Sequence, residues 1–416
     1  MFSEYYVYRR KLLGISSVQI ARQIDRLIKP STLKMPPNAI SSPPDALPTC
    51  PEDQVLSGSQ SGAGGASKQT GVLFEADADT NDGGLTMDIT QFKNAEKRKL
   101  KWVWRNIVLF AYVHVAALYG GYLLVTQAKW ATIVFSMFLY SAGMIGITGG
   151  AHRLWAHRSY KAKWPLRVIL VAFNSIAFQD AAYHWARDHR VHHKFSETDA
   201  DPHNATRGFF FSHVGWLLCK KHPDVVAKGK SLDLSDLRAD RVLMFQKKHY
   251  FVLMPLACFI LPTCIPMLCW NESLLCSVLV PTIFRWCLQL NMTWLVNSAA
   301  HKFGGRPYDK NINPSQSPYV SLFTLGEGWH NYHHVFPWDY KTAEWGNYSL
   351  NMTTAFIDLF AKIGWAYDLK SVVPETVERR VRRTGDGSHE LWGWGDKDLT
   401  PEDGQSVLHV LDKKSN

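Results

Sequence analysis

The chain has 416 residues, a formal net charge of +10 and 46% hydrophobic residues, with a mean hydropathy of −0.16. The length would suit two or three soluble domains, but the apolar residues are concentrated in four long runs, which argues against an ordinary soluble protein. The basic residues are not interleaved with aromatic residues as in nucleic-acid-binding proteins. We therefore expect membrane lipids, and no nucleic acid, as the partners of this positive charge.

Residues 1–96 differ in composition from the rest of the chain. Residues 36–85 are rich in Pro, Ser, Gly and Asp, as in SSPPDALP and SGSQSGAGGASKQ, which predicts disorder. The first 30 residues place basic side chains between Leu and Ile, which favours a basic amphipathic helix on a membrane surface and leaves a transit peptide as the alternative. We expect an N-terminal extension (1–96), a membrane domain (97–375) and a flexible C-terminal tail (376–416).

The four apolar runs predict membrane-spanning helices, because about 20 apolar residues cross the hydrocarbon core of a bilayer. They cover residues 104–126, 130–150, 250–270 and 273–297. Only residues 127–129 and 271–272 separate the members of each pair, so we expect two transmembrane hairpins. Two buried helical hairpins in a soluble protein are the alternative. The expected fold class is an all-α membrane protein with four spans and a further helical domain.

Lysine and arginine are distributed unequally about these spans. They cluster before the first and third spans and after the second and fourth, whereas the two short connections contain one Lys between them. By the positive-inside rule, both termini and the segment 151–249 are expected in the cytosol. Arg285 is the one strong charge well inside a predicted span, which favours a tilted fourth helix that projects into the cytosol.

Histidines recur in three short motifs along the chain. These are HRLWAH, with His152 and His157; HRVHH, with His189, His192 and His193; and HNYHH, with His330, His333 and His334. On a helix, positions i, i+3 and i+4 share one face, so each HxxHH is expected to direct three imidazoles at one point. Imidazole is a neutral ligand for zinc, copper, iron or nickel. Scattered helix histidines are the alternative, but two HxxHH matches are improbable by chance.

Two further observations concern the number of metals. His152 and His157 are five residues apart and do not share a face of a straight α-helix, so either the helix breaks or the two bind different metals. In NSAAH, Asn297 and His301 are four apart at the end of the fourth span, which makes His301 a ninth candidate ligand and Asn297 a group that could hold a metal-bound water. Nine imidazoles exceed the coordination number of one ion and predict two metals.

The type of metal can also be argued from the motifs. A zinc hydrolase would ordinarily carry HExxH, and that motif is not found in the sequence. Many neutral ligands with open positions instead suit iron that activates dioxygen.

These motifs resemble a known family. HRLWAH, WARDHRVHHKFSETDADPHN, RGFFFSHVGWLL, NSAAH and GEGWHNYHH are similar to the acyl-CoA desaturases of animals, most closely the insect-like delta-9 (stearoyl-CoA) type within the membrane fatty acid desaturases. The resemblance covers about residues 97–375. It implies a cytosolic helical domain that caps four spans and a di-iron centre held by the nine histidines, with Asn297 acting through water.

The resemblance also implies the reaction and its participants. A cis double bond would be inserted, at carbon 9, into a long-chain acyl-CoA by an oxygen-dependent oxidoreductase of the endoplasmic reticulum membrane. Dioxygen would be the oxidant, and cytochrome b5 with its NADH-dependent reductase would supply electrons. A membrane fatty acyl hydroxylase with the same iron chemistry and a non-oxidative zinc hydrolase are the alternatives. The terminal Lys413 and Lys414 are similar to the dilysine retrieval signal of the endoplasmic reticulum.

A set of substrate contacts follows from the same resemblance: Asn106, Asp180, Arg187, Asp188, Lys220, Lys221 and Trp294. Lys220 and Lys221 carry the charge expected for the phosphates of CoA. Two positions depart from the family pattern, because Asp180 stands where Asn is usual and His184 stands where many members have Glu. Neither departure removes a candidate metal ligand.

Overall fold

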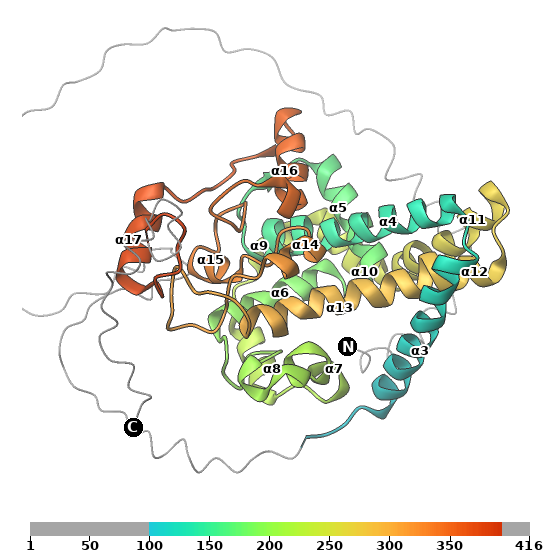
Figure 1. Cartoon of the computed structure of the whole chain (residues 1–416), viewed down its shortest axis with the longest axis horizontal. Coiled ribbons are helices and arrows are strands. Elements are labelled where there is room, and N and C mark those ends of the chain that lie inside the picture. The colour runs from blue at the N-terminus through green and yellow to red at the C-terminus, as the bar shows by residue number, and fades with distance from the viewer. Residues whose placement is uncertain (1–99, 393–416) are drawn as a thin grey trace, which may run out of the picture. The chain divides into compact units, whose positions relative to one another are not determined.

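The computed structural model describes residues 100–392, and almost all of its regular structure is helical (Figure 1). The expected N-terminal extension and the residues beyond 392 lie outside the described residues. Within them, the strands β1 (Lys161–Ala162) and β2 (Ala366–Tyr367) form one antiparallel pair. The helical content agrees with the predicted all-α class.

Four helical stretches are long and apolar enough to cross a membrane: Trp104–Thr126, Trp130–Ala156, Arg241–Trp270 and Leu274–His301. The first coincides with the predicted span. The other three extend beyond the predictions, to Ala156 in the second, from Arg241 in the third and to His301 in the fourth. The added residues include charged and histidine side chains, which composition alone had excluded from the apolar runs.

Three of these stretches change helix type along their length. The second joins α4 (Trp130–Ile145) to the π-helix η3 (Gly146–Ala156). The third consists of α10 (Arg241–Pro255), the π-helix η6 (Leu256–Ile260) and α11 (Leu261–Trp270). The fourth consists of α12 (Leu274–Val278), the π-helix η7 (Leu279–Phe284), α13 (Arg285–Ser298) and the 3-10 turn η8 (Ala299–His301). Pro255 immediately precedes η6 and Pro281 lies within η7, where a missing amide proton interrupts the α-helical pattern.

The first span, α3 (Trp104–Thr126), packs chiefly against η7 of the fourth span, and in Figure 1 it diverges from α4. Gly120 lies at this contact, where a Cβ atom would come within 2.4 Å of the Leu279 carbonyl oxygen. The α11 and α12 helices contact each other directly. The two short connections meet at Glu272, which accepts hydrogen bonds from the Lys129 amide at 2.9 Å and the Thr132 hydroxyl at 2.5 Å.

Arg285, the charged residue of the fourth span, is 1% exposed. Its guanidinium donates to the carbonyl oxygens of Ile176 at 2.9 Å, Pro281 at 3.0 Å and Cys258 at 3.2 Å. Cys258 and Pro281 lie in π-helices, where backbone carbonyls lose their usual α-helical donors. Arg285 therefore joins three helical segments by their backbones inside the protein.

The remaining helices surround one end of the spans. They are α5 (Trp164–Ala177), α6 (Ala182–Lys194), η4 (Ala205–Arg207), η5 (Phe211–Gly215), α7 (Trp216–Leu218), α8 (Pro223–Ser231), α9 (Ser235–Ala239), α14 (Pro318–Thr324), α15 (His330–Val335), η9 (Tyr348–Leu350), α16 (Met352–Lys362) and α17 (Pro374–Thr384). The largest buried apolar cluster includes Met144, Trp155, Leu170, Ala186 and Ile357, so it joins α4, η3, α5, α6 and α16. This core packs together η3 and α6, two of the segments that carry the histidine motifs.

The structure differs from the expected flexible tail at residues 376–384, which belong to α17. Val377 and Val381 of this helix are buried against Tyr308, Tyr332 and Phe336. The sequence PETVERRVRRT carries only these two apolar residues, four apart, so its burial depended on a partner surface elsewhere in the chain.

Candidate metal centre

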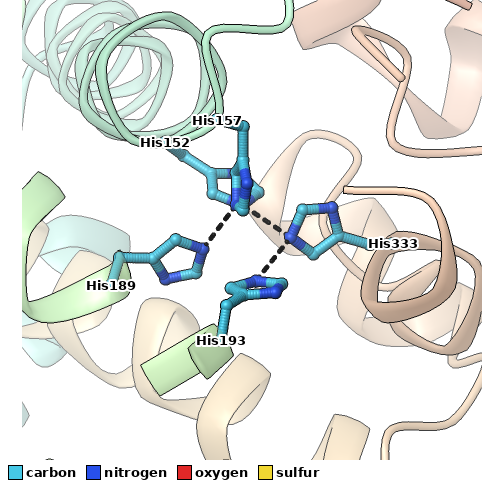
Figure 2. Close-up of side chains that lie close together, drawn as sticks. All are labelled: His152, His157, His189, His193 and His333. Carbon is cyan, nitrogen blue, oxygen red and sulfur yellow. Dashed lines mark hydrogen bonds between the residues drawn. The ribbon is translucent and has the colours of Figure 1, made fainter. Parts of the chain in front are cut away.

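Five histidines from three segments form one cluster. Their ligand atoms all lie within 4.8 Å of one another, and the members are His152, His157, His189, His193 and His333. The Nε2 atoms are 3.0 Å apart for His152 and His333, 2.8 Å for His157 and His189, and 3.0 Å for His193 and His333. Figure 2 shows the five rings pointing toward one another from these segments. We call this group the five-histidine cluster.

Four further histidines form a second group, the four-histidine cluster. Its members are His192, His301, His330 and His334. The Nε2 atom of His330 lies 3.1 Å from that of His301 and 3.0 Å from that of His334. The two clusters are neighbours, because the rings of His193 and His334 stack with their centroids 4.2 Å apart. The structure thus brings together all nine histidines predicted from the sequence.

Each HxxHH motif is divided between the clusters, which corrects the expectation that its three imidazoles point at one spot. On α6, His189 and His193 enter the five-histidine cluster, whereas His192 enters the four-histidine cluster. On α15 the division is reversed, because His330 and His334 enter the four-histidine cluster and His333 the other. The first and last histidines of each motif are four residues apart and lie on one face of the helix. The middle histidine is rotated away from them, far enough to reach the neighbouring cluster.

His152 and His157 lie in the same cluster because the helix that carries them widens. His152 lies in the π-helix η3, in which each hydrogen bond spans five residues, and His157 is the C-cap residue of this helix. The His157 amide donates to the His152 carbonyl at 3.0 Å. Residues five apart are then successive in the helix and can reach one point. The helix does not break between the two histidines, as one of the two alternatives expected; it continues as a π-helix, and both histidines reach the same cluster.

Carboxylates contact the outward-facing ring nitrogens. The Nδ1 atom of His152 lies 2.9 Å from Glu327, and that of His192 lies 2.9 Å from Asp201. Since carboxylate oxygens only accept, each Nδ1 carries the proton and each Nε2 presents its lone pair to the cluster. Metal-ligating histidines are usually oriented in this way.

The clusters favour neutral imidazole. Burial, followed by repulsion from neighbouring histidines, lowers the pKa well below the usual value for six of the cluster histidines outside the spans: His157, His189, His193, His330, His333 and His334. Neutral imidazole is the form that binds a metal. Burial opposes ionisation of Glu327, but Arg153 and His152 outweigh it and lower the pKa of this carboxyl to about 2.

The geometry of the donor atoms also fits a metal. Two nitrogens that each lie about 2.1 Å from a common metal at a right angle would be about 3.0 Å apart. The observed separations of 2.8 to 3.1 Å agree with this value.

Asn297, the residue predicted to hold a metal-bound water, is half-buried on α13, four residues before His301.

Five of the seven predicted substrate contacts lie on or beside α3 and α6. Asp188 accepts from Arg187 Nη2 at 2.7 Å and forms an ion pair with Lys221. Asn106 donates to the Leu217 carbonyl at 2.8 Å, and the exposed Lys220 donates its amide to the Lys101 carbonyl. The segments 101–103 and 218–220 are therefore paired, and Asn106 bonds to the residue just before the second segment.

The other two predicted contacts lie on different elements. Trp294 is buried on α13, with its ring 5.6 Å from that of Phe110 on α3. Asp180 has a positive φ of 81° and accepts from the Ala181 amide at 2.7 Å. The same carboxylate lies 3.2 Å from Nδ1 of His184, so the two departures from the family pattern contact each other.

Sequence reasoning missed the residues around the ligands. Asp201, Glu327 and Arg153 are buried, and His203 forms a further group with His192 and Asp201. Burial lowers the pKa of His203 to about 3, with a smaller contribution from His192. Asp201 and His203 occur in SETDADPHN, directly after the HRVHH motif. An acidic residue and a histidine two residues apart beside that motif could have indicated these two positions.

Two adjacent clusters of histidines that could hold metal, in a chain with four apolar helices long enough to span a membrane, define a class of multi-pass membrane protein with a histidine-rich site. The chain belongs to the fatty acid desaturase family, which it matches over residues 128–367. Members of this family are oxidoreductases, and the resemblance seen in the sequence is confirmed.

Three relatives illustrate the similarity. The chain is 62% identical to an acyl-CoA Delta-9 desaturase of Acheta domesticus over 341 residues, which cover 81% of this chain and 95% of the relative. It is 57% identical to an acyl-CoA Delta12-desaturase of the same species over 338 residues, covering 81% and 95%. A stearoyl-CoA desaturase of Bos taurus is 52% identical over 328 residues, covering 79% and 91%.

Proposed function

We propose that this protein is an acyl-CoA desaturase that inserts a cis double bond at carbon 9 of a saturated long-chain acyl-CoA. The main support is the pair of histidine clusters in a chain of this family, together with the names of its relatives. In the net reaction, the substrate loses two hydrogens, and dioxygen takes up these, two electrons and two protons to give two waters. Cytochrome b5 and its NADH-dependent reductase are the proposed source of the electrons.

We propose two iron ions as the cofactors, one in each cluster. Bound iron would supply the activation of dioxygen that abstraction of hydrogen from an unactivated methylene requires. The five-histidine cluster offers five imidazoles, and the four-histidine cluster offers four, with Asn297 as the group that would hold a water there. Neutral nitrogen donors with few carboxylates among them suit iron better than calcium or magnesium.

The residues of this chain would bind and orient the substrate. Arg187, Lys220 and Lys221 carry charges suited to the CoA phosphates, while Asp188 fixes two of these side chains in place. Asn106, Asp180 and Trp294 are proposed to contact the part of the substrate between the CoA head and the acyl chain. Successive methylenes are chemically alike, so the position of the double bond must depend on where the chain is held.

The proposed location is the endoplasmic reticulum membrane, with both termini and the histidine clusters on the cytosolic side. The distribution of lysine and arginine about the spans supports this orientation. Tags at residue 2, near residue 230 and at the C-terminus should then be degraded by protease added to sealed microsomes. Protection of the tag near residue 230 would contradict the proposed topology.

The position of the double bond is the part of the proposal that most needs a direct test. Relatives named for positions 9 and 12 in one species are 62% and 57% identical to this chain, so identity alone does not decide between them. Expression in a desaturase-deficient yeast, followed by mapping of double bonds in its fatty acids, tests it. We expect unsaturation at carbon 9. Double bonds only at other positions would contradict this regiospecificity, and products that gain an oxygen atom would identify a hydroxylase.

A further inference from the structure

The two histidine clusters differ in the charged groups that surround the carboxylates in contact with the Nδ1 atoms of their histidines. In the five-histidine cluster, Glu327 contacts Nδ1 of His152. In the four-histidine cluster, Asp201 contacts Nδ1 of His192, and Glu197 lies 3.5 Å from Nδ1 of His301. Two carboxylates of one short segment, Asp201 and Glu197, therefore contact ligands of the four-histidine cluster.

The charge behind the five-histidine cluster is balanced by arginine. Arg153 donates to Glu327 from Nε at 3.1 Å and from Nη2 at 2.9 Å, and this guanidinium is completely buried. A second arginine, Arg190, caps the carbonyls of Trp155 and Ala156 and is paired with Asp236 at 2.6 Å. Glu327 and Asp236 are therefore each paired with a buried arginine.

The charge behind the four-histidine cluster has no such balance. Apart from His192, Asp201 accepts hydrogen bonds from the amides of Glu197 at 2.9 Å and His203 at 3.0 Å, which are uncharged donors. Within residues 100–392, no lysine or arginine forms an ion pair with Asp201 or Glu197. Two lysines beside this loop, Lys194 and Lys228, lie over the Phe195 ring instead.

The loop that carries these carboxylates has a disfavoured backbone conformation. Glu197 has a positive φ of 64°, which non-glycine residues rarely adopt. The bond from its amide to Asp201 holds this conformation and turns the Glu197 side chain toward His301. One short segment thus brings both carboxylates to the same cluster, and strained conformations of this kind are concentrated at functional sites.

We propose that Asp201 and Glu197 are positioning residues that retain the metal of the four-histidine cluster, their unbalanced negative charge compensating for the imidazole that this cluster lacks. The inference rests on the proposed function, in which each cluster holds one iron. A carboxylate bonded to Nδ1–H makes the opposite nitrogen a better donor and stabilises the positive charge of the metal. Loss of such a group typically lowers metal affinity 10- to 100-fold.

The test is the release of iron from the purified full-length protein to a chelator for ferrous iron. The wild-type protein should release two irons per chain in two phases. His157→Ala and His301→Ala, which each remove a ligand from one cluster, identify the phase that belongs to each. Asp201→Asn should accelerate the phase that is missing from His301→Ala about 10- to 100-fold and leave the other phase unchanged. Glu197→Gln, whose side chain is more exposed, should accelerate the same phase by less.

Asp358→Asn is the matched control, because Asp358 accepts hydrogen bonds only from Tyr340 and Tyr348 in the described part of the chain. It should leave both phases unchanged. The inference would be overturned if Asp201→Asn accelerated both phases or neither phase. It would also be overturned if Asp201→Asn accelerated the phase that is missing from His157→Ala. If Asp201→Asn does not fold, an unchanged release from folded Glu197→Gln would overturn it as well. A wild-type protein that binds no iron would instead contradict the proposed function.

Discussion

The His157 amide donates to the His152 carbonyl at 3.0 Å, across a turn that contains one residue more than an α-helical turn. This turn ends η3, and it brings two histidines that are five apart in sequence into one cluster. Its position depends on close packing with α5. At Gly146, the first residue of η3, a Cβ atom would come within 2.2 Å of the Asn174 amide nitrogen and 2.3 Å of the Phe173 carbonyl carbon.

We therefore predict that Gly146→Ala separates η3 from α5. Because backbone atoms are the obstacle, neither helix can yield by rotating a side chain, and we expect a loss of at least about 1–3 kcal/mol of stability. The thermal unfolding midpoint in detergent and the iron content of the purified protein would measure the effect. Gly149→Ala is the matched control in the same π-helix, since its Cβ would meet only ordinary contacts at 3.6 Å. Equal midpoints for the two variants would contradict the prediction.

A second prediction concerns the ligands themselves. His333→Ala should abolish desaturation and lower the iron content, because His333 contacts both His152 and His193 in the five-histidine cluster. The protein should remain in the membrane, since the four spans are unchanged. His249→Ala on α10, outside both clusters, is the control and should keep its activity and iron. Full activity of His333→Ala would refute the assignment of His333 as a ligand.

His389 is a poor control for such experiments, although the sequence places it far from the motifs. It is buried, lies 2.8 Å from Glu344 and accepts hydrogen bonds from the amides of Leu391 and Trp392. We expect His389→Ala to lower stability without a specific loss of iron. A thermal midpoint equal to that of the wild type would show that these contacts contribute little.

The comparison of sequence with structure separates local from tertiary information. The spans and the nine histidines were predicted because apolar runs and HxxHH spacing are local features. The division of each motif between two clusters was not, because it depends on how α6 and α15 face each other. Glu327 was missed for the same reason, since 174 residues separate it from its partner Arg153. The widened turn at His157 also required tertiary packing, because periodicity arguments assume an α-helix throughout.

A further prediction concerns substrate binding near α3 and α6. Lys220→Ala and Lys221→Ala should raise the KM for acyl-CoA more than they lower kcat, because each removes a charge proposed to contact phosphate far from the reacting carbons. A charge-assisted hydrogen bond contributes about 1.5–3 kcal/mol, so we expect roughly a 10- to 100-fold rise where the contact is made. The matched control is Lys362→Ala, an exposed lysine at the end of α16. A fall in kcat with an unchanged KM would contradict a role in binding the CoA head.

The last prediction follows from the depressed pKa of the cluster histidines. In the unfolded chain, histidine titrates near pH 6.5, whereas the folded pKa of six members lies well below that value. Below about pH 6.5, the unfolded chain therefore binds more protons than the folded protein, and the free energy of unfolding falls with acidification. Above this pH the six histidines are neutral in both the folded protein and the unfolded chain, so they add no pH dependence to the free energy of unfolding.

Chelator-treated, metal-free protein tests this prediction most directly. Each such histidine can contribute up to about 1.4 kcal/mol per pH unit in the affected range, so the thermal midpoint should be flat from about pH 8 to about pH 7 and fall steeply toward about pH 5. The iron-loaded protein should lose iron over the same acidic range, because protons and metal compete for the same Nε2 lone pairs. A midpoint of the metal-free protein that stays constant or rises on acidification would mean that these imidazoles are not buried in neutral form.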